Sequence, residues 1–283
     1  MLVVFVTAVQ ELPSLGAGGL LHPSRRSVNT SPPPGCEDAS FAGDGVALKG
    51  WRCPAQGARR GAIIYLHGIA DNRTSSHGVI RRFAPQGFDV VAYDSRAHGD
   101  SEGAACTYGF FEKRDLHRIV DTLASQPIVL IGTSLGAAVA LQEAADDPRV
   151  SAIVAAEAFS DLRTVATERA PFVFTSTLIE RAFRLAERQG NFNVDAVSPV
   201  SAAARIHVPV LLIHGAADAE TPPEHSRRIF AALAGPKRLI VVPAAHHNQS
   251  LNGPVWGDIE QWLDDALRGQ ISIFHFLRNG SRS

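Results

Sequence analysis

A serine within a short glycine-rich turn is the first residue whose surroundings suggest chemistry. Ser134 lies in the pentapeptide GTSLG (132–136), directly after the apolar run PIVLI (127–131) and before an alanine-rich segment. A strand that turns this sharply into a helix exposes the serine hydroxyl, and the flanking residues must be small because strand and helix crowd each other. We therefore predict that Ser134 is a nucleophile. The structural alternative is a serine that only caps the following helix.

A serine hydroxyl is a poor nucleophile at neutral pH, so it needs a neighbouring base. Among the eleven histidines, His246 and His247 stand out because they follow the apolar run RLIVVP (238–243) in a loop of small residues. Loops at the carboxyl ends of parallel strands hold the functional groups of open α/β sheets. One of these two histidines is therefore expected to be the base, and the residues alone leave the choice open.

The base needs a carboxylate to orient it. Asp218 lies in HGAADAETPP (214–223), directly after another apolar run, and it comes after the serine and before the histidine pair. Catalytic triads occur with the chain order Ser, Asp, His. Asp218 is therefore the predicted acid, and its structural alternative is a turn residue before a helix. Asp161, which follows the run SAIVAAE (151–157), is the rival acid.

An oxyanion that forms during attack on a carbonyl needs two aligned N–H donors. The first is expected from the backbone of Leu135, the residue after the nucleophile. The second should come from a loop after an earlier strand, and LHGIA (66–70) fits this position. We predict the Ile69 amide as this donor, with an ordinary turn at a strand end as the alternative.

The rest of the chain alternates short apolar runs with helical patterns, as a parallel sheet requires. Strands are predicted at 61–68, 88–94, 127–132, 151–157, 209–215 and 238–243, and helices at 75–86, 111–126, 135–146 and 253–268. Alternating strands and helices predict a mostly parallel sheet covered on both faces. Strands buried on both faces explain why the apolar runs are nearly continuous.

On these segments the chain resembles the serine α/β-hydrolases, in particular the bacterial subgroup that is serine aminopeptidase- and lysophospholipase-like. The segments that carry the resemblance are YLHGIADNR (65–73), VAYDSRAHGDSEG (91–103), IGTSLGAAVA (131–140), LLIHGAADAETPPEHS (211–226) and VVPAAHHN (241–248). The resemblance covers about residues 45–267. It implies the α/β-hydrolase fold, with a mostly parallel central sheet, helices on both faces and a short helical cap.

The resemblance also implies roles for individual residues. His247 aligns with the family's catalytic histidine because Asn248 follows it, whereas His246 takes the place of a usual glycine and stays the alternate. The family needs no cofactor, and we expect no metal. The loop at 93–103 is expected to support the site without reacting, and its polar residues include Asp94, Arg96 and His98.

The predicted domain organisation is one hydrolase domain at 41–268, with a cap insertion at about 160–207. Residues 1–40 form an N-terminal segment and linker, and 269–283 form a C-terminal tail. The cap carries apolar residues at helical spacing, which either line an acyl pocket or pack against the sheet edge. These residues are Phe172, Phe174, Leu178, Ile179, Phe183 and Leu185.

Composition excludes several other classes of function. The 27 lysines and arginines balance 28 aspartates and glutamates, so no electrostatic footprint for nucleic acid is present. Cys36, Cys53 and Cys106 lack metal-ligand spacing, and we expect free thiols, although a Cys36–Cys53 bridge is geometrically conceivable. The N-terminal apolar run is too short to span a bilayer as written. We expect a cytoplasmic protein, with membrane association through residues 1–25 as the alternative.

The sequence thus predicts a hydrolase that cleaves a carboxylic ester or thioester of a small-molecule acyl substrate through an acyl-enzyme. A peptidase or amidase acting on small substrates is one alternative. The other is a non-catalytic protein that keeps the fold and binds a ligand. The acyl group, the leaving group and the oligomeric state are not predicted from these residues.

Overall fold

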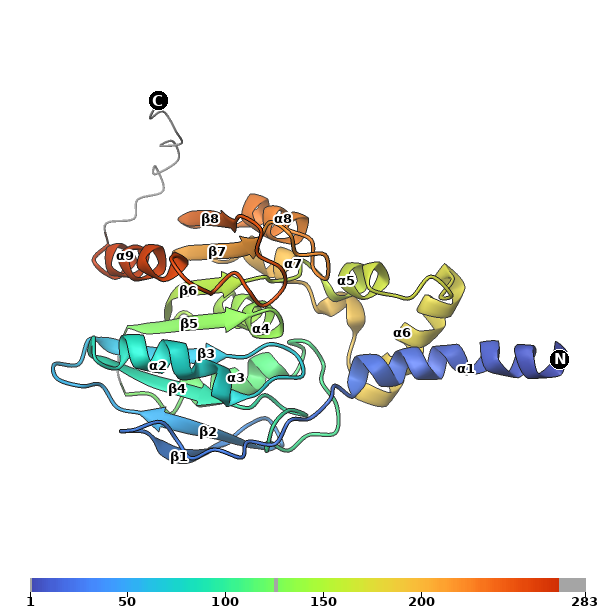
Figure 1. Cartoon of the computed structure of the whole chain (residues 1–283), viewed down its shortest axis with the longest axis horizontal. Coiled ribbons are helices and arrows are strands. Elements are labelled where there is room, and N and C mark those ends of the chain that lie inside the picture. Colours follow the sequence, from blue (N-terminus) through green and yellow to red (C-terminus); the bar gives the residue numbers. More distant parts are fainter. Residues whose placement is uncertain (1, 125–126, 270–283) are drawn as a thin grey trace, which may run out of the picture.

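The computed structural model describes residues 2–124 and 127–269, and these form an eight-stranded sheet (Figure 1). The strands are β1 (Glu37–Ala42), β2 (Ala47–Cys53), β3 (Gly61–Leu66), β4 (Phe88–Tyr93), β5 (Ile128–Thr133), β6 (Val150–Ala156), β7 (Val210–Gly215) and β8 (Lys237–Val242). Their order across the sheet is β1-β2-β4-β3-β5-β6-β7-β8. The pairs β1–β2 and β2–β4 are antiparallel and the other pairs are parallel, which confirms the predicted mostly parallel sheet.

Helices cover both faces of this sheet (Figure 1). One face packs against α2 (His77–Phe83) and α9 (Val255–Leu267), and the other against α3 (Glu112–Val120), α4 (Leu135–Ala144) and α8 (Glu224–Ala232). Successive residues of a strand point to opposite faces. In β3, Ile63 and Tyr65 therefore join the α2–α9 core, while Ile64 and Leu66 join the other. This two-sided burial explains the continuous apolar runs.

The cap follows β6 and consists of α5 (Leu162–Glu168), α6 (Ser176–Gly190), the 3₁₀ turn η2 (Val194–Ala196) and α7 (Pro199–Ala203). The long α6 begins where the Thr175 hydroxyl accepts a hydrogen bond from the Leu178 amide, and it ends before Asn191, whose backbone is left-handed. Its buried face meets an N-terminal helix, α1 (Leu2–Leu21), which runs beside it in Figure 1.

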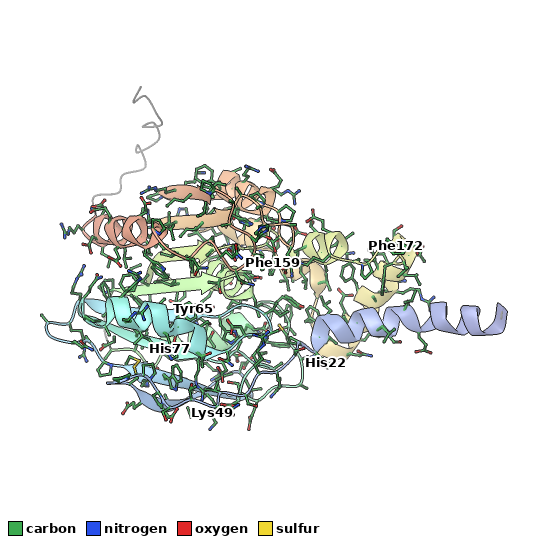
Figure 2. All side chains as sticks on the ribbon, viewed as in Figure 1. His22, Lys49, Tyr65, His77, Phe159 and Phe172 are labelled. Atoms are coloured by element: carbon green, nitrogen blue, oxygen red, sulfur yellow. A yellow bond between two sulfur atoms is a disulfide. The ribbon has the colours of Figure 1, made fainter. Side chains whose placement is uncertain are left out.

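This pairing of α6 with α1 differs from one of the two interpretations of the cap's apolar residues, namely packing against the sheet edge. Phe183 and Ala186 of α6 pack in one cluster with Ala17 and Leu21 of α1, so α6 does not pack against the sheet edge. Phe172, expected on an inner face, is 98% exposed at the outer end of the cap (Figure 2). Within the described residues, no helix combines the length and the apolar content that crossing a membrane requires.

The two antiparallel strands at the start of the sheet were not predicted. β1 begins at Glu37, inside the segment expected to be a linker, and β2 pairs with it so that Glu37 lies opposite Arg52. One further step along this register places Cys36 opposite Cys53, and the two form a disulfide. The prediction of free thiols is therefore wrong for this pair, while Cys106 is free and buried. The tail at 270–283 lies outside the described residues.

The disulfide bears on where the protein folds. Disulfides form and persist mainly in oxidising compartments and are rare in the cytosol. The Cys36–Cys53 bond is thus at odds with the expected cytoplasmic location.

Replacing both bonded cysteines by serine should lower the free energy of unfolding by about 3 kcal/mol, because the bond closes a short loop and restricts the unfolded chain. The separation of the two cysteines is 17 residues. Urea unfolding of the parent and of Cys36→Ser/Cys53→Ser, each with and without a reductant, measures this. The matched control is Cys106→Ala. A reductant should lower the free energy of unfolding of the parent and of the control, but not that of the double variant. Equal free energies of unfolding for all three proteins would contradict the prediction.

Candidate active site

The turn that carries Ser134 is set by close backbone contacts. Ser134 has φ 49° and ψ −111°, a conformation that L-residues rarely adopt, and its amide donates to the Ala156 carbonyl at 2.8 Å. A Cβ at Gly132 would lie 2.5 Å from the Gly136 carbonyl, and a Cβ at Gly136 would collide with the Leu66 carbonyl oxygen. Only glycine fits at both places, so the pentapeptide pattern follows from the packing of β5, α4 and the end of β3.

A chain of hydrogen bonds joins three of the predicted residues. His247 Nε2 lies 3.0 Å from Ser134 Oγ, and His247 Nδ1 lies 2.7 Å from Asp218 Oδ2. Because an ionised carboxylate only accepts, Nδ1 carries the proton and Nε2 is left to accept from the serine hydroxyl. The three side chains come from loops after β7 and β8 and from the turn after β5. They therefore meet at the carboxyl edge of the sheet.

The two alternate residues, His246 and Asp161, are not part of this hydrogen-bond chain. His246 is exposed, and its backbone amide donates to Gln249 Oε1 at 3.1 Å. Asp161 caps α5, where Oδ1 accepts from the Thr164 amide at 2.8 Å. The structure brings His247 and Asp218, and neither alternate, to Ser134. Adjacent histidines in a turn point in different directions, and for this reason one of the two reaches the serine.

The Asp218 carboxylate is held in its ionised form. Burial by itself would raise the pKa of Asp218, but hydrogen bonds with His214 and His247 and from the Thr221 amide leave this pKa well below its ordinary value. The Thr221 and Glu220 amides donate to Oδ1 at 2.9 and 3.0 Å. Asp218 is therefore negatively charged at neutral pH and favours a protonated imidazole next to it.

A second carboxylate, missed in the sequence analysis, holds the loop that carries His247. Glu157 is 1% exposed and directly follows β6. Its oxygens accept from the Asn248 amide at 2.6 Å and the Ser250 amide at 2.9 Å, and one of them lies 3.9 Å from His247 Nδ1. The available signal was a charged residue at the end of an otherwise apolar strand. Its partner loop lies about ninety residues further along the chain, so spacing could not reveal the contact.

The loop predicted to supply an oxyanion donor is fixed by a buried histidine. His67 Nε2 accepts from the Ser95 amide at 2.9 Å, so Nδ1 carries the proton and donates to the Gly68 carbonyl at 2.7 Å. Burial lowers the pKa of His67, which keeps this ring neutral. In a trans peptide the N–H points opposite to the C=O, so the Ile69 amide points away from His67. Leu135 begins α4, and its amide has no acceptor within the helix.

The loop after β4 is held by ion pairs. Asp94 pairs with Arg73 and accepts from the Asp100 amide at 2.9 Å. Arg96 pairs with Asp115 at 2.6 Å. His98 Nδ1 lies 2.9 Å from the Arg96 carbonyl, and burial lowers the pKa of His98 to about 4. These contacts brace the loop whose Ser95 amide holds His67.

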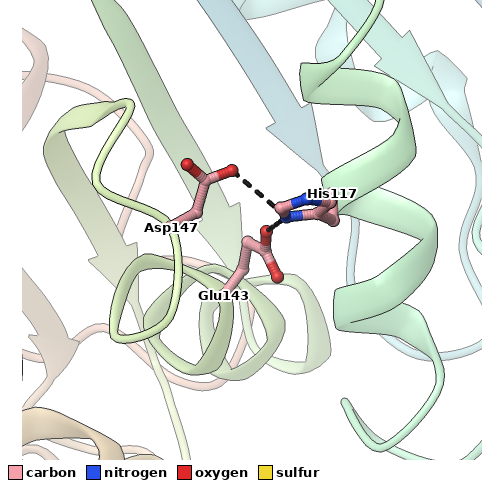
Figure 3. Close-up of side chains that lie close together, drawn as sticks. All are labelled: His117, Glu143 and Asp147. Atoms are coloured by element: carbon pink, nitrogen blue, oxygen red, sulfur yellow. Dashed lines mark hydrogen bonds and ion pairs between the residues drawn. The ribbon is translucent and has the colours of Figure 1, made fainter.

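Two groups of side chains in the described residues place metal-ligand atoms close together. One is Glu157 with Asp218 and His247, in which His247 Nδ1 already contacts Asp218 at 2.7 Å. The other lies between α3 and α4, where His117 Nδ1 is 2.8 Å from Glu143 and 3.3 Å from Asp147 (Figure 3). The Arg149 guanidinium binds Asp147 at 2.6 Å, so a protein cation already pairs with one of the two carboxylates of this second group.

Comparison with known proteins adds to this geometry. A family model described as alpha/beta hydrolase fold matches residues 61–198. The uncharacterized protein Rv2307c of Mycobacterium tuberculosis is 30% identical over 80% of this chain and 79% of its own length. The uncharacterized protein YfhR of Escherichia coli K12 is 27% identical over 94% of this chain and 93% of its own. The solved esterase Pf2001 of Pyrococcus furiosus is 26% identical, with a TM-score of 0.67 over 87% of this chain and 97% of its own.

Glu157→Gln should slow the reaction of Ser134 with a fluorophosphonate about tenfold, because an amide cannot accept from both backbone donors of the histidine loop. Losing a negative charge near the imidazole should also move the acid limb of the pH–rate profile to lower pH. Intact-protein mass spectrometry across a pH series measures both. The matched control is Asp161→Asn, a carboxylate that caps α5. A slower reaction with an unmoved pH profile would reduce Glu157 to a structural role.

A second prediction concerns Glu143. Burial raises the pKa of Glu143 from 4.5 to about 7, although His117 opposes the shift. The folded state therefore prefers the neutral acid, and this stabilisation is complete below about pH 4.5 and lost as the pH rises through about 7. We compare the free energy of urea unfolding at about pH 5 and about pH 8. Between these two pH values it should decrease less in Glu143→Gln than in the parent, and the difference should be up to about 3 kcal/mol. Glu224→Gln, which alters an exposed carboxylate, should follow the parent, and identical pH dependence of all three would refute the assignment.

Proposed function

The chain belongs to the alpha/beta hydrolase fold family, and from that premise we propose that it is a serine hydrolase that cleaves carboxylic esters or thioesters. The fold and the esterase among its structural relatives support hydrolase activity. The observation that carries the finer proposal is the hydrogen-bond chain from Asp218 through His247 to Ser134. A serine next to a base whose other nitrogen is oriented by a carboxylate is the arrangement that nucleophilic catalysis requires.

The mechanism that we propose begins with attack on the acyl carbon. Ser134 Oγ forms a bond to the carbonyl carbon while its proton passes to His247 Nε2, 3.0 Å away. Asp218 accepts from Nδ1 throughout, so its negative charge stabilises the imidazolium that forms. Negative charge develops on the carbonyl oxygen, and the amides of Leu135 and Ile69 are the donors that we assign to it.

The tetrahedral intermediate then collapses. His247 gives its proton to the leaving alcohol or thiol, the bond to the leaving group breaks, and an acyl-Ser134 ester remains. Water next gives a proton to His247 and attacks the acyl carbon. The second tetrahedral intermediate releases the carboxylic acid and restores the Ser134 hydroxyl. Each proton moves through His247, so the reaction needs no other acid or base.

Glu157 adds a role that the three residues alone do not provide. Its two hydrogen bonds fix the backbone on the far side of His247, and its charge lies 3.9 Å from Nδ1. We assign it as a positioning residue that holds the imidazole in line with the serine. It does not contact the reacting atoms.

Ser134→Ala should lose turnover of a nitrophenyl ester by about a thousandfold or more while the protein stays folded, because the covalent step is removed. His247→Ala should fall to a similar level, whereas His246→Ala should keep the parent rate because its side chain is exposed and outside the hydrogen-bond chain. Fluorophosphonate adducts, read by intact mass, should form on the parent and on His246→Ala only.

The outcome that overturns the proposal is parental turnover in Ser134→Ala. A matched ester and anilide, assayed at equal concentrations, separates an esterase from the amidase or peptidase alternative. A folded parent that forms no adduct and turns over no ester would favour the ligand-binding alternative.

A further inference from the structure

An apolar cavity of about 510 Å³ lies between α1 and the cap. Helix α1 contributes Gly16 and Gly19, and the cap contributes Phe174 and Phe183. Ile69 also lines it, so the cavity reaches the loop that we assign to the oxyanion. Its size lies within the usual range for small-molecule sites, which are concave and mostly apolar.

A second cavity, of about 620 Å³, meets the first at Ile69. Its lining is largely polar and includes Asp71, Arg26 and Arg81. Thr133, next to the nucleophile, and Glu157 also line it. An ester carbonyl at Ile69 therefore has an apolar compartment on one side and a polar compartment on the other.

From this arrangement we propose that α1 is part of the substrate site, and that α1 and the cap together bind a medium-length aliphatic acyl chain. The inference rests on the proposed ester hydrolysis. The acyl chain enters the apolar cavity, because burying methylene groups there removes apolar surface from water. The leaving group is polar and faces the second cavity. The substrate class is thus an ester of an aliphatic acid with a polar alcohol or thiol.

The glycines of α1 explain how the cavity stays open. A Cβ at Gly16 would lie 3.0 Å from Ala182 and from the Phe174 ring, so this glycine lets α1 approach the cap closely. A Cβ at Gly19, one helical turn later, would meet nothing within 4 Å, so this glycine leaves space. Gly18 also has open space at its Cβ but does not line the cavity. It therefore provides a matched control.

The edge of the cavity carries unusually exposed apolar side chains. Leu15 lines the cavity and is 67% exposed, and Pro171 and Phe174 line it on either side of the fully exposed Phe172 (Figure 2). Large exposed apolar patches on a protein surface mark sites of interaction with ligands or partners. An aliphatic substrate would approach over this edge before its chain enters between α1 and the cap.

The cap is also tied to the acid of the hydrogen-bond chain. Arg169, which lines the cavity, donates to the Glu220 carbonyl at 2.7 Å and to the Thr221 hydroxyl. The Glu220 and Thr221 amides in turn donate to Asp218. The wall of the acyl cavity and the orienting carboxylate are thus held by one loop, which fixes the cavity relative to the reacting serine.

Gly19→Phe tests the assignment because a phenylalanine ring at this position fills the cavity. The ratio of kcat/KM for nitrophenyl octanoate to that for nitrophenyl acetate should fall by about tenfold or more relative to the parent. Gly18→Phe adds the same side chain to the same helix turn, and should leave this ratio as it is in the parent. Both changes replace a helical glycine and so affect helix propensity equally.

A binding measurement separates this inference from the proposed function. Displacement of anilinonaphthalene sulfonate fluorescence by dodecanoate, in the Ser134→Ala background, reports on the cavity without turnover. Dodecanoate should bind the background and its Gly18→Phe derivative, and bind the Gly19→Phe derivative at least about tenfold more weakly.

Each remaining outcome decides one of the two proposals. If the protein cleaves esters but the octanoate-to-acetate ratio of kcat/KM is unchanged in Gly19→Phe, the acyl cavity is overturned and the hydrolase stands. The same conclusion follows if this ratio falls equally in Gly18→Phe and Gly19→Phe. If the parent cleaves no ester, but dodecanoate binding is weakened by Gly19→Phe and not by Gly18→Phe, the cavity is supported and the hydrolase is overturned.

Discussion

The contact between the start of α4 and the end of β3 constrains the whole site. At Gly136 the helix backbone lies so close to the Leu66 carbonyl that no side chain fits between them. This approach forces the sharp turn between β5 and α4 and puts Ser134 in its strained conformation with positive φ. It also places the loop that begins at His67 beside the nucleophile, where a Cβ on Gly68 would lie 3.7 Å from that of Ser134. Ser134 and the loop that we assign to the oxyanion are therefore positioned by one packing contact.

The histidine is positioned by charge. Two buried carboxylates, Asp218 and Glu157, act on the same short loop, one through the imidazole and the other through the backbone on its far side. Burying a carboxylate is costly unless it is hydrogen-bonded. Asp218 accepts from backbone amides and from the imidazole, and Glu157 accepts from the Asn248 and Ser250 amides. The chain thus retains two buried negative charges within reach of His247. A protonated imidazole gains most from such an arrangement, and this is the charge state that serine attack generates.

Those features that follow from local sequence were predictable. The six parallel strands were found because burial on both faces leaves continuous apolar runs, and Ser134 was found because its turn imposes small neighbours at fixed spacing. The antiparallel pair of β1 and β2 was missed because β1, its outer strand, is mostly exposed and follows three prolines. The Cys36–Cys53 bond depends on their register, which no local pattern encodes. Glu157 was missed for a similar reason, since its partners Asn248 and Ser250 are close only after β6 and β8 join one sheet. The choice of His247 over His246 came from family resemblance and not from the residues themselves.

The N-terminal helix α1 lies outside the segment that the family model matches, and it still borders the cavity beside the candidate site. The family match spans 61–198 and so leaves α1 out. Yet Leu21 and Ala17 are 1% exposed against the cap, and the Cys106 amide donates to the Leu21 carbonyl at 2.8 Å. The helix end is thus fixed to the body, while Gly16 lets the helix approach the cap closely and Gly19 leaves space beside the cap. In the proposed reaction, the sheet and its loops position the reacting groups, and the packing of α1 on α6 sets the space for the acyl group. Under the function that we propose, a change in α1 therefore alters which esters are cleaved without altering how Ser134 reacts.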